Sequence, residues 1–448
     1  MKIERIILFS IILAALTFGY GDARQIVEAR GGKVKAVKYD DGTWELLVNN
    51  KPYFIKGVLF GPVKIGESPD EATMRDWMYY DDNNDGRNDI AFETWLDKNM
   101  NNKRDADEKI EGDFKLLKDM GCNTIRLYHI PSDSHLLGNI YKENPSMALQ
   151  FDHPVNKELL RKLYQDYGIM VAMGNFVGSW TIGSGASWEE GTDYTNPKHR
   201  ENIKKSVKAM VLDNKDEPYV LMWVLGNENN IADWSRCNAK THPEEYAKLI
   251  EELAEMIHKL DPEHPVAVCD GDNFNTLKEY AKYAPSLDII GYNSYRGEYG
   301  FVFLWKEVKR TFDRPVFISE FGIFAYNKDV GEEQDYQLRY IKGCWRDIAR
   351  NSSQNYVPSK RVSGNSIGGF VFDWIDRWYM DGSPSQHNPG TRYWDSPDQL
   401  RHEEWFGIVS MGDGSDWLMR QKRKVYDYLK DTWKNGENGT GSTFPGAN

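Results

Sequence analysis

Cysteine is scarce in this sequence, with four residues in 448 and no CxxC pair among them. This number and spacing exclude a disulfide-stapled scaffold and give no sign of a zinc site. Cys122 and Cys269 adjoin apolar, strand-like runs, so we expect both to pack as small hydrophobic side chains. Histidine pairs of the HxH or HExxH type are also missing, which argues against a metal-based reaction.

Extremes of charge and hydrophobicity are absent as well. No Lys/Arg-rich run occurs and the formal net charge is −12, which disfavours a nucleic-acid partner because phosphate binding requires clustered positive charge. Hydrophobic residues make up 40% and charged residues 28%, a balance typical of folded globular proteins. A chain of 448 residues is long enough for one large α/β barrel or for two ordinary domains.

The most extended apolar stretch lies at the N-terminus, from Ile6 to Tyr20. It follows a short charged start, precedes the small residues Gly21 and Ala23, and is short for a stable membrane span. This pattern predicts a secretory signal peptide over residues 1–23. We expect a secreted, periplasmic or cell-surface protein with no stable membrane span after cleavage; an uncleaved N-terminal anchor is the alternative.

Aromatic residues, in contrast, are abundant at 13%, with 15 Trp and 25 Tyr. Most such residues belong to protein cores, but several stand in polar, loop-like contexts. These are Trp77, Tyr79, Tyr80, Trp180, Trp188, Trp234, Trp378, Tyr379, Tyr393 and Trp394. Flat apolar faces with a polar tip suit ligands that are half apolar, such as the C–H faces of sugar rings.

Strand-like runs alternate with helical patterns along most of the chain. Turn signals at DDG and NNKP predict a short N-terminal β-hairpin within residues 24–56. Eight strands are predicted at 55–61, 123–129, 169–176, 219–227, 265–270, 288–294, 315–322 and 368–374. Helices are predicted within 107–121, 156–168, 196–214, 243–261 and 332–351.

This alternation predicts an α/β protein with a single (β/α)₈ TIM barrel domain over residues 57–435 and a disordered tail over residues 436–448. A doubly wound open sheet is the alternative, but no Gly-rich phosphate loop follows any of the strands.

Polar residues follow the apolar runs at the predicted carboxyl ends of the barrel strands, where functional groups of such barrels lie. They are Arg126, His129, Asn175, Asn227, Glu228, Asp270, Asn293, Tyr295, Glu320, Asp373 and Trp374. Glu228 and Glu320 follow strands four and seven, which face each other across a barrel mouth. Cleavage of a glycosidic bond needs such a pair, one carboxyl to protonate the leaving oxygen and one to attack or to activate water.

Four segments resemble the catalytic barrel of the clan A retaining glycoside hydrolases, most closely that of family 2, which includes β-galactosidases and β-glucuronidases. NTIRLYHIP is similar to the family's strand-two segment, WVLGNE to its acid/base segment, ISEFG to its nucleophile segment and GGFVFDWID to its strand-eight segment. The lead-in NKPYFIKGV is similar too. The similarities occur in the family's order between residues 50 and about 410.

The resemblance implies a role for each matching residue. Glu228 would be the general acid/base and Glu320 the nucleophile. The sugar would be bound by Arg126, His129, Asn175, Asn227, Asn293, Tyr295 and Trp374, with Asn227 on the 2-hydroxyl, Arg126 and Tyr295 on the nucleophile, and Trp374 as the pocket floor. An acid needs a raised pKa, which apolar walls such as Trp223 would provide.

We therefore expect a secreted retaining enzyme that cleaves β-glycosidic bonds of a carbohydrate substrate by double displacement and requires no organic cofactor. A β-glucan transglycosidase using the same two glutamates is one alternative. A catalytically silent carbohydrate-binding barrel is another, although such a protein would not need both carboxylates.

An acidic insertion at residues 81–108 is the last feature. Its second half has oxygen-bearing side chains at the ligand positions of an EF-hand-type loop: Asp97, Asn99, Asn101, Asp105 and Glu108, with Lys103 at the carbonyl position. Its first half begins alike, with Asp81, Asn83, Asp85 and Asp89, but has Phe92 at the last position. The pattern predicts a structural Ca²⁺ that stiffens a wall of the cleft; an acidic solvated loop is the alternative.

Overall fold

The computed structural model describes residues 24–130, 155–231, 235–358 and 362–434. The predicted signal peptide, residues 1–23, and the predicted tail, residues 436–448, lie outside these ranges.

Eight parallel strands form a closed barrel, so the predicted fold class is confirmed. In barrel order the strands are β5 (Ile55–Leu59), β7 (Thr124–Leu127), β8 (Met170–Asn175), β9 (Val220–Leu225), β10 (Val266–Gly271), β11 (Ile289–Asn293), β12 (Val316–Phe321) and β15 (Ser366–Val371). Each predicted strand is found within about two residues of its predicted start. All eight are buried along their whole length apart from Lys56, as expected for strands covered on both faces.

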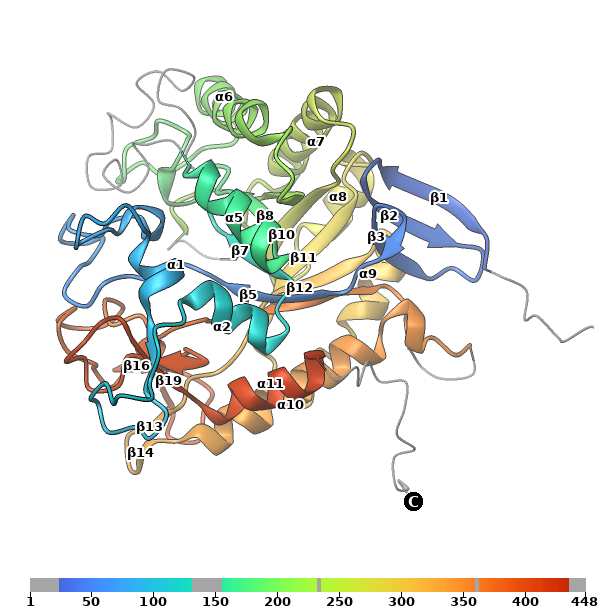
Figure 1. Ribbon diagram of the computed structural model, residues 1–448. Helices are drawn as coiled ribbons and strands as arrows, with labels where there is room; N and C mark the ends of the chain where they lie inside the picture. The colour runs from blue at the N-terminus through green and yellow to red at the C-terminus, as the bar shows by residue number, and fades with distance from the viewer. Residues whose placement is uncertain (1–23, 131–154, 232–234, 359–361, 435–448) are drawn as a thin grey trace, which may run out of the picture.

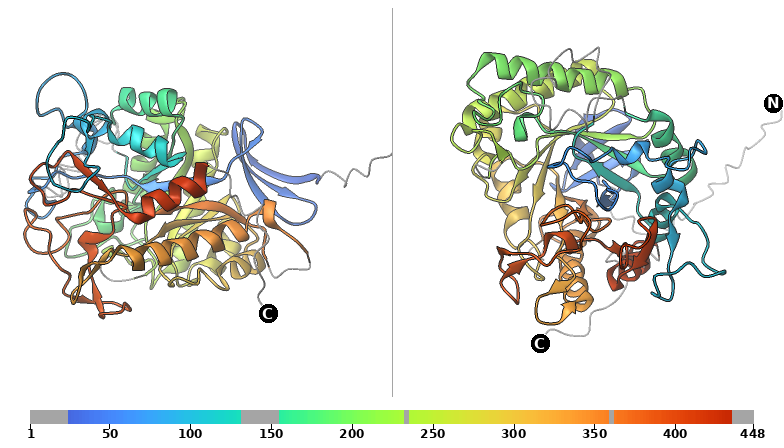
Figure 2. Two further views of the ribbon diagram at one scale, coloured as in Figure 1. Left: turned by 60° about the horizontal axis from the view of Figure 1, so that its bottom comes forward. Right: turned by 90° about the vertical axis from the view of Figure 1, so that its left-hand side faces the viewer.

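In the described part of the chain each barrel strand is followed by a helix that packs on the outside of the barrel (Figures 1 and 2). The helices are α2 (Asp113–Met120), α5 (Lys157–Tyr167), α6 (Pro197–Asn214), α7 (Pro243–Leu260), α8 (Leu277–Tyr283), α9 (Leu304–Thr311), α10 (Gln334–Arg350) and α11 (Lys424–Lys434). Three of these, α8, α9 and α11, were not predicted. Helix α5 ends at the expected glycine: Gly168 adopts φ 68°, and its N–H donates to the carbonyls of Leu163 and Tyr164.

The N-terminal element is a four-stranded antiparallel sheet rather than the predicted hairpin. It contains β1 (Ile26–Gly31), β2 (Val34–Tyr39), β3 (Trp44–Val48) and β4 (Lys51–Pro52). The hairpin β2–β3 was predicted. Strand β1 was not, because it is mostly exposed and has no apolar run. Figure 1 shows this sheet at the end of the barrel opposite to the long loops. The indole of Trp44 fixes it there by donating to Asp313 Oδ1 at 3.1 Å.

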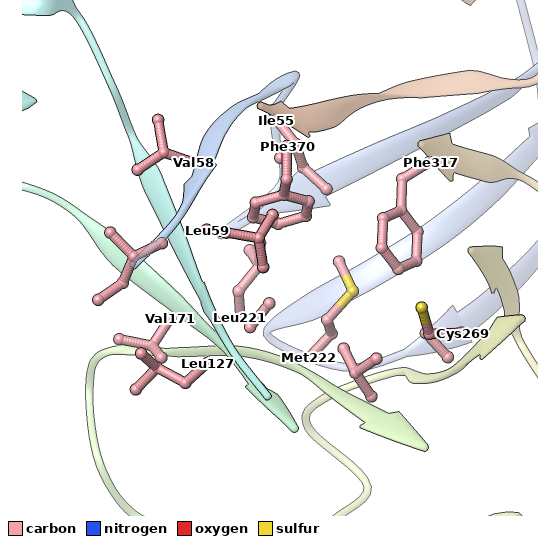
Figure 3. Close-up of a cluster of buried hydrophobic side chains, with 14 of the residues drawn as sticks. Ile55, Val58, Leu59, Leu127, Val171, Leu221, Met222, Cys269, Phe317 and Phe370 are labelled. Carbon is pink, nitrogen blue, oxygen red and sulfur yellow. The ribbon is translucent and has the colours of Figure 1, made fainter. Parts of the chain in front are cut away.

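Large apolar side chains fill the barrel interior, among them Leu59, Phe317 and Phe370 (Figure 3). Glycine at position 57 makes room for one of them, because a Cβ there would lie 2.3 Å from Cδ1 of Phe370. The packing follows the usual rule that large and small residues alternate across a filled barrel.

The longest loops leave the carboxyl ends of β5 and β15, at the left in Figure 1. They contain short elements: α1 (Asp89–Glu93), β6 (Trp95–Leu96), β16 (Arg392–Tyr393), β17 (Leu400–Arg401), β18 (Val409–Ser410) and β19 (Met419–Lys422), while β13 (Tyr326–Asn327) and β14 (Gly331–Glu332) follow β12. Because β6 pairs with β19, the first and last loops of the barrel are joined in one small sheet. Among the described residues no helix has the length and apolar character needed to cross a membrane.

Candidate active site

A cavity of about 1170 Å³ opens at the carboxyl ends of the barrel strands. Six of the predicted site residues line it: His129, Asn227, Glu228, Asn293, Tyr295 and Glu320. A seventh, Arg126, is buried directly beneath and contacts Glu320. Pockets for drug-sized ligands measure roughly 300–1000 Å³. The cavity therefore has room for more than one sugar ring.

Glu320, near the end of β12, accepts hydrogen bonds from three donors, of which Arg126 is buried and Tyr128 and Tyr295 are half-buried. Arg126 Nη1 lies 3.2 Å and the Tyr128 hydroxyl 2.8 Å from Oε1, and the Tyr295 hydroxyl lies 2.6 Å from Oε2. Three donors, one of them a guanidinium, hold this carboxylate in a fixed orientation. Tyr128 was not predicted, although it stands two residues after Arg126 and two-residue spacing puts both side chains on one face of a strand.

Glu228 follows β9 at a tight turn, and its environment favours the protonated form. Gly226 and Glu228 adopt φ 76° and 55°, and the Glu228 N–H donates to the Cys269 carbonyl at 3.2 Å. Although one side of Glu228 is open to the cavity, burial raises the pKa of its carboxyl to about 8, and the charge of Glu320 raises it further. A hydrogen bond from Asn293 opposes this increase in pKa. A raised pKa of this kind is what a general acid needs in order to hold its proton near neutral pH.

Asn227 is held by its amide oxygen. Arg126 Nη2 donates to Asn227 Oδ1 at 2.7 Å and Asn293 Nδ2 donates to the same oxygen at 3.1 Å. Because Oδ1 faces the barrel interior, the amide nitrogen of Asn227 is left to face the cavity that this residue lines. It can donate a hydrogen bond to a ligand there.

Cys269 differs from its predicted role as a small hydrophobic side chain. Its Sγ lies 3.0 Å from Arg126 Nη2 and 3.0 Å from Ser319 Oγ, so its surroundings are largely polar. Burial raises the pKa of the thiol to about 12, which keeps it neutral. These polar contacts were not predicted, because a strand that is buried on both faces has a continuous apolar sequence even where one of its residues contacts polar groups.

His129 lines the cavity as a neutral imidazole. Its ring stacks on Phe176 with centroids 5.5 Å apart, and Nδ1 accepts the Phe176 N–H at 3.3 Å. Burial lowers the pKa of His129 to about 3. With Nδ1 acting as the acceptor, the ring proton resides on Nε2, which makes this nitrogen the donor.

Three residues named in the sequence analysis lie outside the cavity and face the helix layer. Asn175 donates to Ser206 Oγ of α6 at 3.0 Å, and Trp374 donates through Nε1 to Asp113 Oδ2 of α2 at 2.9 Å. Trp223 donates to Asp261 Oδ2 at 2.8 Å and forms no wall for Glu228. The prediction placed these side chains on the wrong side of their strands, because successive residues alternate between interior and helix layer.

The loop after β15 supplies Trp394, one of the loop aromatics singled out above, and four charged lining residues that the sequence did not reveal: Arg377, Arg392, Arg401 and Glu403. The hairpin β16–β17 brings Arg401 over the ring of Trp394 at 4.8 Å. Trp394 in turn packs edge-to-face against Tyr295, with the ring centroids 6.0 Å apart. An aromatic and cationic wall therefore stands beside the two glutamates.

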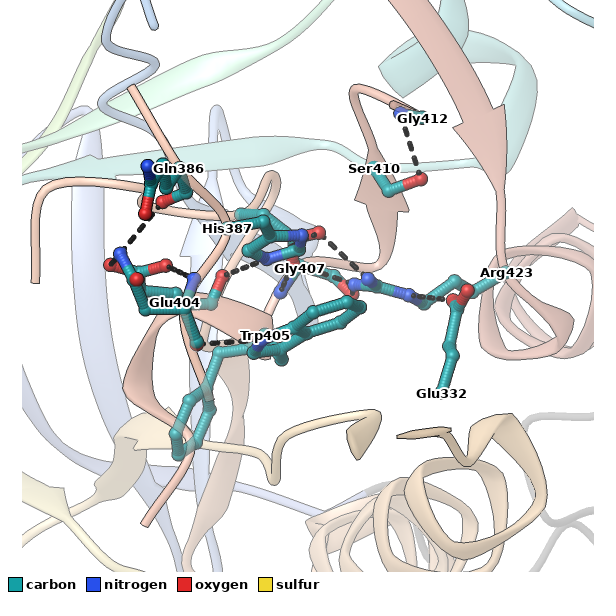
Figure 4. Close-up of polar contacts among 12 residues, drawn as sticks. Glu332, Gln386, His387, Glu404, Trp405, Gly407, Ser410, Gly412 and Arg423 are labelled. Carbon is teal, nitrogen blue, oxygen red and sulfur yellow. Dashed lines mark hydrogen bonds and ion pairs between the residues drawn. The ribbon is translucent and has the colours of Figure 1, made fainter. Parts of the chain in front are cut away.

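A buried cluster holds this loop in place (Figure 4). The imidazole of His387 lies between the rings of Trp378 and Trp405, with centroid distances of 4.8 and 3.5 Å. Arg423 forms an ion pair with Asp376 at 2.6 Å, which ties the loop to the start of α11. These contacts join residues far apart in the sequence and fix the path of the loop toward the cavity.

The acidic insertion adopts two turns of similar construction. Asp97 accepts the N–H groups of Asn101 and Asn102, as Asp81 accepts those of Asp85 and Gly86. The sixth positions, Asn102 and Gly86, have φ 60° and 82°. Further turn bonds within these loops involve Asn83, Asn99 and Lys103.

The same loops meet the demands of calcium only in part. Both carboxylate oxygens of Glu108 accept backbone N–H groups, from Lys98 at 2.6 Å and Asp105 at 3.0 Å. Asp89 is buried, and its Oδ1 has no hydrogen-bond partner in the described chain. Among the described residues no three carboxylate, imidazole or thiol groups stand close enough together to hold a metal ion. The turns fit a cation loop, whereas Glu108 would first have to release two N–H groups.

A closed (β/α)₈ barrel with two glutamates at one cavity on its carboxyl-end face is the arrangement of a glycoside hydrolase. Within this class the chain belongs to glycosyl hydrolase family 2, because the model of that family's TIM barrel domain matches residues 97–346. The family assignment and the enzyme class made from the sequence are thereby confirmed.

Individual relatives are distant. A probable mannan endo-1,4-β-mannosidase C of Aspergillus terreus is 25% identical over 169 residues, which cover 32% of this chain and 41% of that protein. The β-glucuronidase of Bifidobacterium dentium has a TM-score of 0.49 at 17% identity, over 92% of this chain and 49% of its own. The β-galacturonidase of Eisenbergiella tayi has a TM-score of 0.47 at 16% identity, over 93% and 54%. The chain thus spans about half the length of these relatives or less.

Proposed function

We propose that this glycoside hydrolase cleaves β-glycosidic bonds of oligo- or polysaccharides with retention of configuration at the anomeric carbon. The proposal rests on one observation: Glu320 accepts three hydrogen bonds, while the pKa of nearby Glu228 is raised to about 8. A nucleophile must be ionised and a general acid must hold its proton. The β configuration is supported by the name of the Aspergillus relative.

In the first step a carboxylate oxygen of Glu320 attacks the anomeric carbon and the bond to the glycosidic oxygen breaks. The Glu228 carboxyl gives its proton to that oxygen, so the leaving sugar departs as an alcohol. In the second step Glu228, now a carboxylate, takes a proton from water. The water oxygen attacks the anomeric carbon, the ester bond to Glu320 breaks, and both glutamates return to their starting states.

Other cavity residues bind the sugar in this proposal. The outward amide nitrogen of Asn227 donates to the 2-hydroxyl, and His129 Nε2 donates to a further hydroxyl. Arg126, Tyr128 and Tyr295 hold the nucleophile through the bonds described above. Trp394 offers an aromatic surface beside Tyr295. Interactions with the 2-hydroxyl strengthen in the transition states of such reactions.

Aryl β-glycosides and β-linked polysaccharides, β-mannan among them, are the substrates for the test. Glu320→Gln and Glu228→Gln are compared with wild type and with Glu255→Gln, a control on the exposed face of α7. We expect activity to be lost in the first, strongly reduced in the second and unchanged in the control. NMR of the first-formed product should show the β anomer. An initial α anomer, or full activity in Glu320→Gln, would overturn the proposal.

A transglycosidase is the second candidate, favoured by the volume of the cavity. A space of about 1170 Å³ has room for an acceptor sugar next to the glycosyl-enzyme. Products longer than the substrate would identify transfer, and only shorter products would identify hydrolysis. Binding of glycans with no turnover of any substrate would instead indicate a silent binding barrel.

We also propose that Ca²⁺ binds the insertion at residues 81–108 and stiffens the adjoining wall of the cleft. The turns at Asp81 and Asp97 support this, and the unpartnered oxygen of Asp89 gives one further acceptor. Asp97, Asn99, Asn101 and the Lys103 carbonyl would hold the ion. The melting temperature should be higher with calcium than with a chelator. Equal melting temperatures with calcium and with the chelator would contradict the proposal.

Export is proposed on the N-terminal pattern alone. Residues 1–23 would be removed on secretion, so the mature protein would begin near Arg24. N-terminal sequencing and the mass of protein recovered outside the cytoplasm test this. An intact N-terminus on membrane-bound protein would indicate an anchor instead.

A further inference from the structure

Cys269 occupies the centre of a buried polar cluster below both glutamates. It lies in β10 and points into the barrel interior (Figure 3). Its Sγ is 3.0 Å from Arg126 Nη2, 3.0 Å from Ser319 Oγ and 3.3 Å from Asn293 Oδ1. A thiol is both a weak donor and a weak acceptor, so it can accept from the guanidinium and donate to one of the oxygens. The mechanism proposed above gives this side chain no task.

The orientation of the Asn293 amide depends on this cluster. Its oxygen receives Ser319 Oγ at 2.8 Å, Cys269 Sγ at 3.3 Å and Arg126 Nη1 at 3.4 Å. With three donors around Oδ1, the amide nitrogen has to point the other way. There Nδ2 donates to Asn227 Oδ1 at 3.1 Å.

The orientation of the Asn227 amide follows in turn. Its oxygen is enclosed by Asn293 Nδ2 and by Arg126 Nη2 at 2.7 Å, and Cys269 Sγ lies 3.7 Å away. Donors of the cluster therefore converge on both amide oxygens, and the Asn227 nitrogen is directed at the cavity. Arg126 also needs its acceptors, since its Nε has no hydrogen-bond partner among the described residues. Removing the sulfur would take a further acceptor from this buried charge.

We propose that Cys269 is a positioning residue that keeps the Asn227 amide nitrogen directed at the 2-hydroxyl of the bound sugar. It acts through Arg126 and Asn293 and does not touch substrate. The proposal rests on the function proposed above, because it assumes a sugar with its 2-hydroxyl at Asn227. A methyl group at this position can neither accept from the guanidinium nor donate to an amide oxygen, whereas a serine hydroxyl can do both.

The test compares an aryl β-glycoside with its 2-deoxy analogue, using wild type, Cys269→Ala and Cys269→Ser. The readout is the ratio of kcat/KM for the two substrates. We expect Cys269→Ala to lower this ratio about fivefold, the order of one weakened hydrogen bond, and Cys269→Ser to restore it. A merely structural defect would slow both substrates alike and leave the ratio unchanged.

Cys122 gives the matched control. It is a second buried cysteine next to a barrel strand, but its Sγ donates to the Thr124 carbonyl at 3.2 Å and, in the described part of the chain, forms no hydrogen bond with Arg126, Asn227 or Asn293. Cys122→Ala should leave the ratio at the wild-type value. An unchanged ratio in an active Cys269→Ala variant would overturn the positioning role. If wild type does not distinguish the two substrates, the assignment of Asn227 to the 2-hydroxyl is overturned instead. If wild type is inactive on both, the proposed function itself is overturned.

Discussion

The hydroxyl of Tyr295 donates to Oε2 of Glu320 across 2.6 Å, while Arg126 and Tyr128 serve the opposite oxygen, Oε1. Both oxygens of the proposed nucleophile are therefore held by groups from separate strand ends, those of β7 and β11. A carboxylate fixed in this way can attack in only a narrow range of directions, which is the geometric condition for efficient displacement.

Replacing Tyr295 with phenylalanine removes the hydroxyl that donates to Oε2 while keeping the ring that packs against Trp394. Hydrogen bonds to charged groups contribute about 1.5–3 kcal/mol, so we expect kcat to fall about 10- to 100-fold with a smaller change in KM. Steady-state kinetics on one aryl β-glycoside measure this. Tyr299→Phe is the control, because Tyr299 lies on the same loop and is 86% exposed. Equal kcat for wild type and Tyr295→Phe would contradict the role of Tyr295.

The raised pKa of Glu228 predicts the basic limb of the pH profile. The general acid must be protonated, so kcat/KM should decline as the pH rises through about 8. Substrates with poor leaving groups depend most on proton donation and should show the steepest decline. In Glu228→Gln this limb should disappear, and the rate with poor leaving groups should be lower by about 10²- to 10⁴-fold. A wild-type rate that stays constant to pH 10 would contradict the assignment.

The same carboxyl predicts a change of stability with pH. Its pKa is about 8 in the folded protein against 4.5 in the reference state, so between these values the folded state binds more protons than the unfolded one. The free energy of unfolding therefore falls as the pH rises from about 4.5 to about 8. Glu228→Gln has no proton to lose. From pH 5 to pH 9 we therefore expect the free energy of unfolding of Glu228→Gln, relative to that of wild type, to increase by about 1–3 kcal/mol. This range allows for screening of the charge by water in the cavity.

Urea denaturation at both pH values measures this difference. Asp413→Asn is a suitable control, because Asp413 is an exposed carboxylate in the β18–β19 turn region. Identical pH dependence for wild type and Glu228→Gln would show that Glu228 carries no unusual proton.

The strands and their functional ends could be predicted from the sequence because they produce local patterns. Parallel strands buried on both faces read as continuous apolar runs, and Glu228, Tyr295 and Glu320 stand where those runs stop. In a uniformly apolar run, however, the sequence does not indicate which residues face the barrel interior and which face the helices. For this reason Asn175 and Trp374 were predicted in the cavity but contact α6 and α2.

The loop after β15 could not be predicted for a different reason. Contacts between residues far apart in the sequence, such as the ion pair of Asp376 with Arg423, fix the loop that carries Arg392, Trp394 and Arg401. Those contacts depend on the folded barrel, so no short sequence window contains them. Cys269 was likewise misread, since its polar partners come from β7, β11 and β12.

The stacked His387 gives the last prediction, a loss of stability in acid. Burial lowers the pKa of His387 to about 4, against 6.5 in the reference state, despite the opposing charge of Asp376. Between these values the unfolded chain binds more protons, so the free energy of unfolding falls as the pH drops from about 6.5 to about 4. Nearby charges on Arg423 and Glu332 act on the imidazole in opposite directions.

His387→Phe keeps a flat ring between Trp378 and Trp405 but cannot be protonated. We expect its loss of stability between pH 6.5 and pH 4 to be smaller than that of wild type by about 1–3 kcal/mol. Chemical denaturation at the two pH values is the measurement, and His242→Phe, at the exposed start of α7, is the control. If wild type and His387→Phe lose equal stability, the imidazole is not held neutral by its two indole neighbours, and the loop that carries Arg392 and Trp394 has no acid-sensitive support at this point.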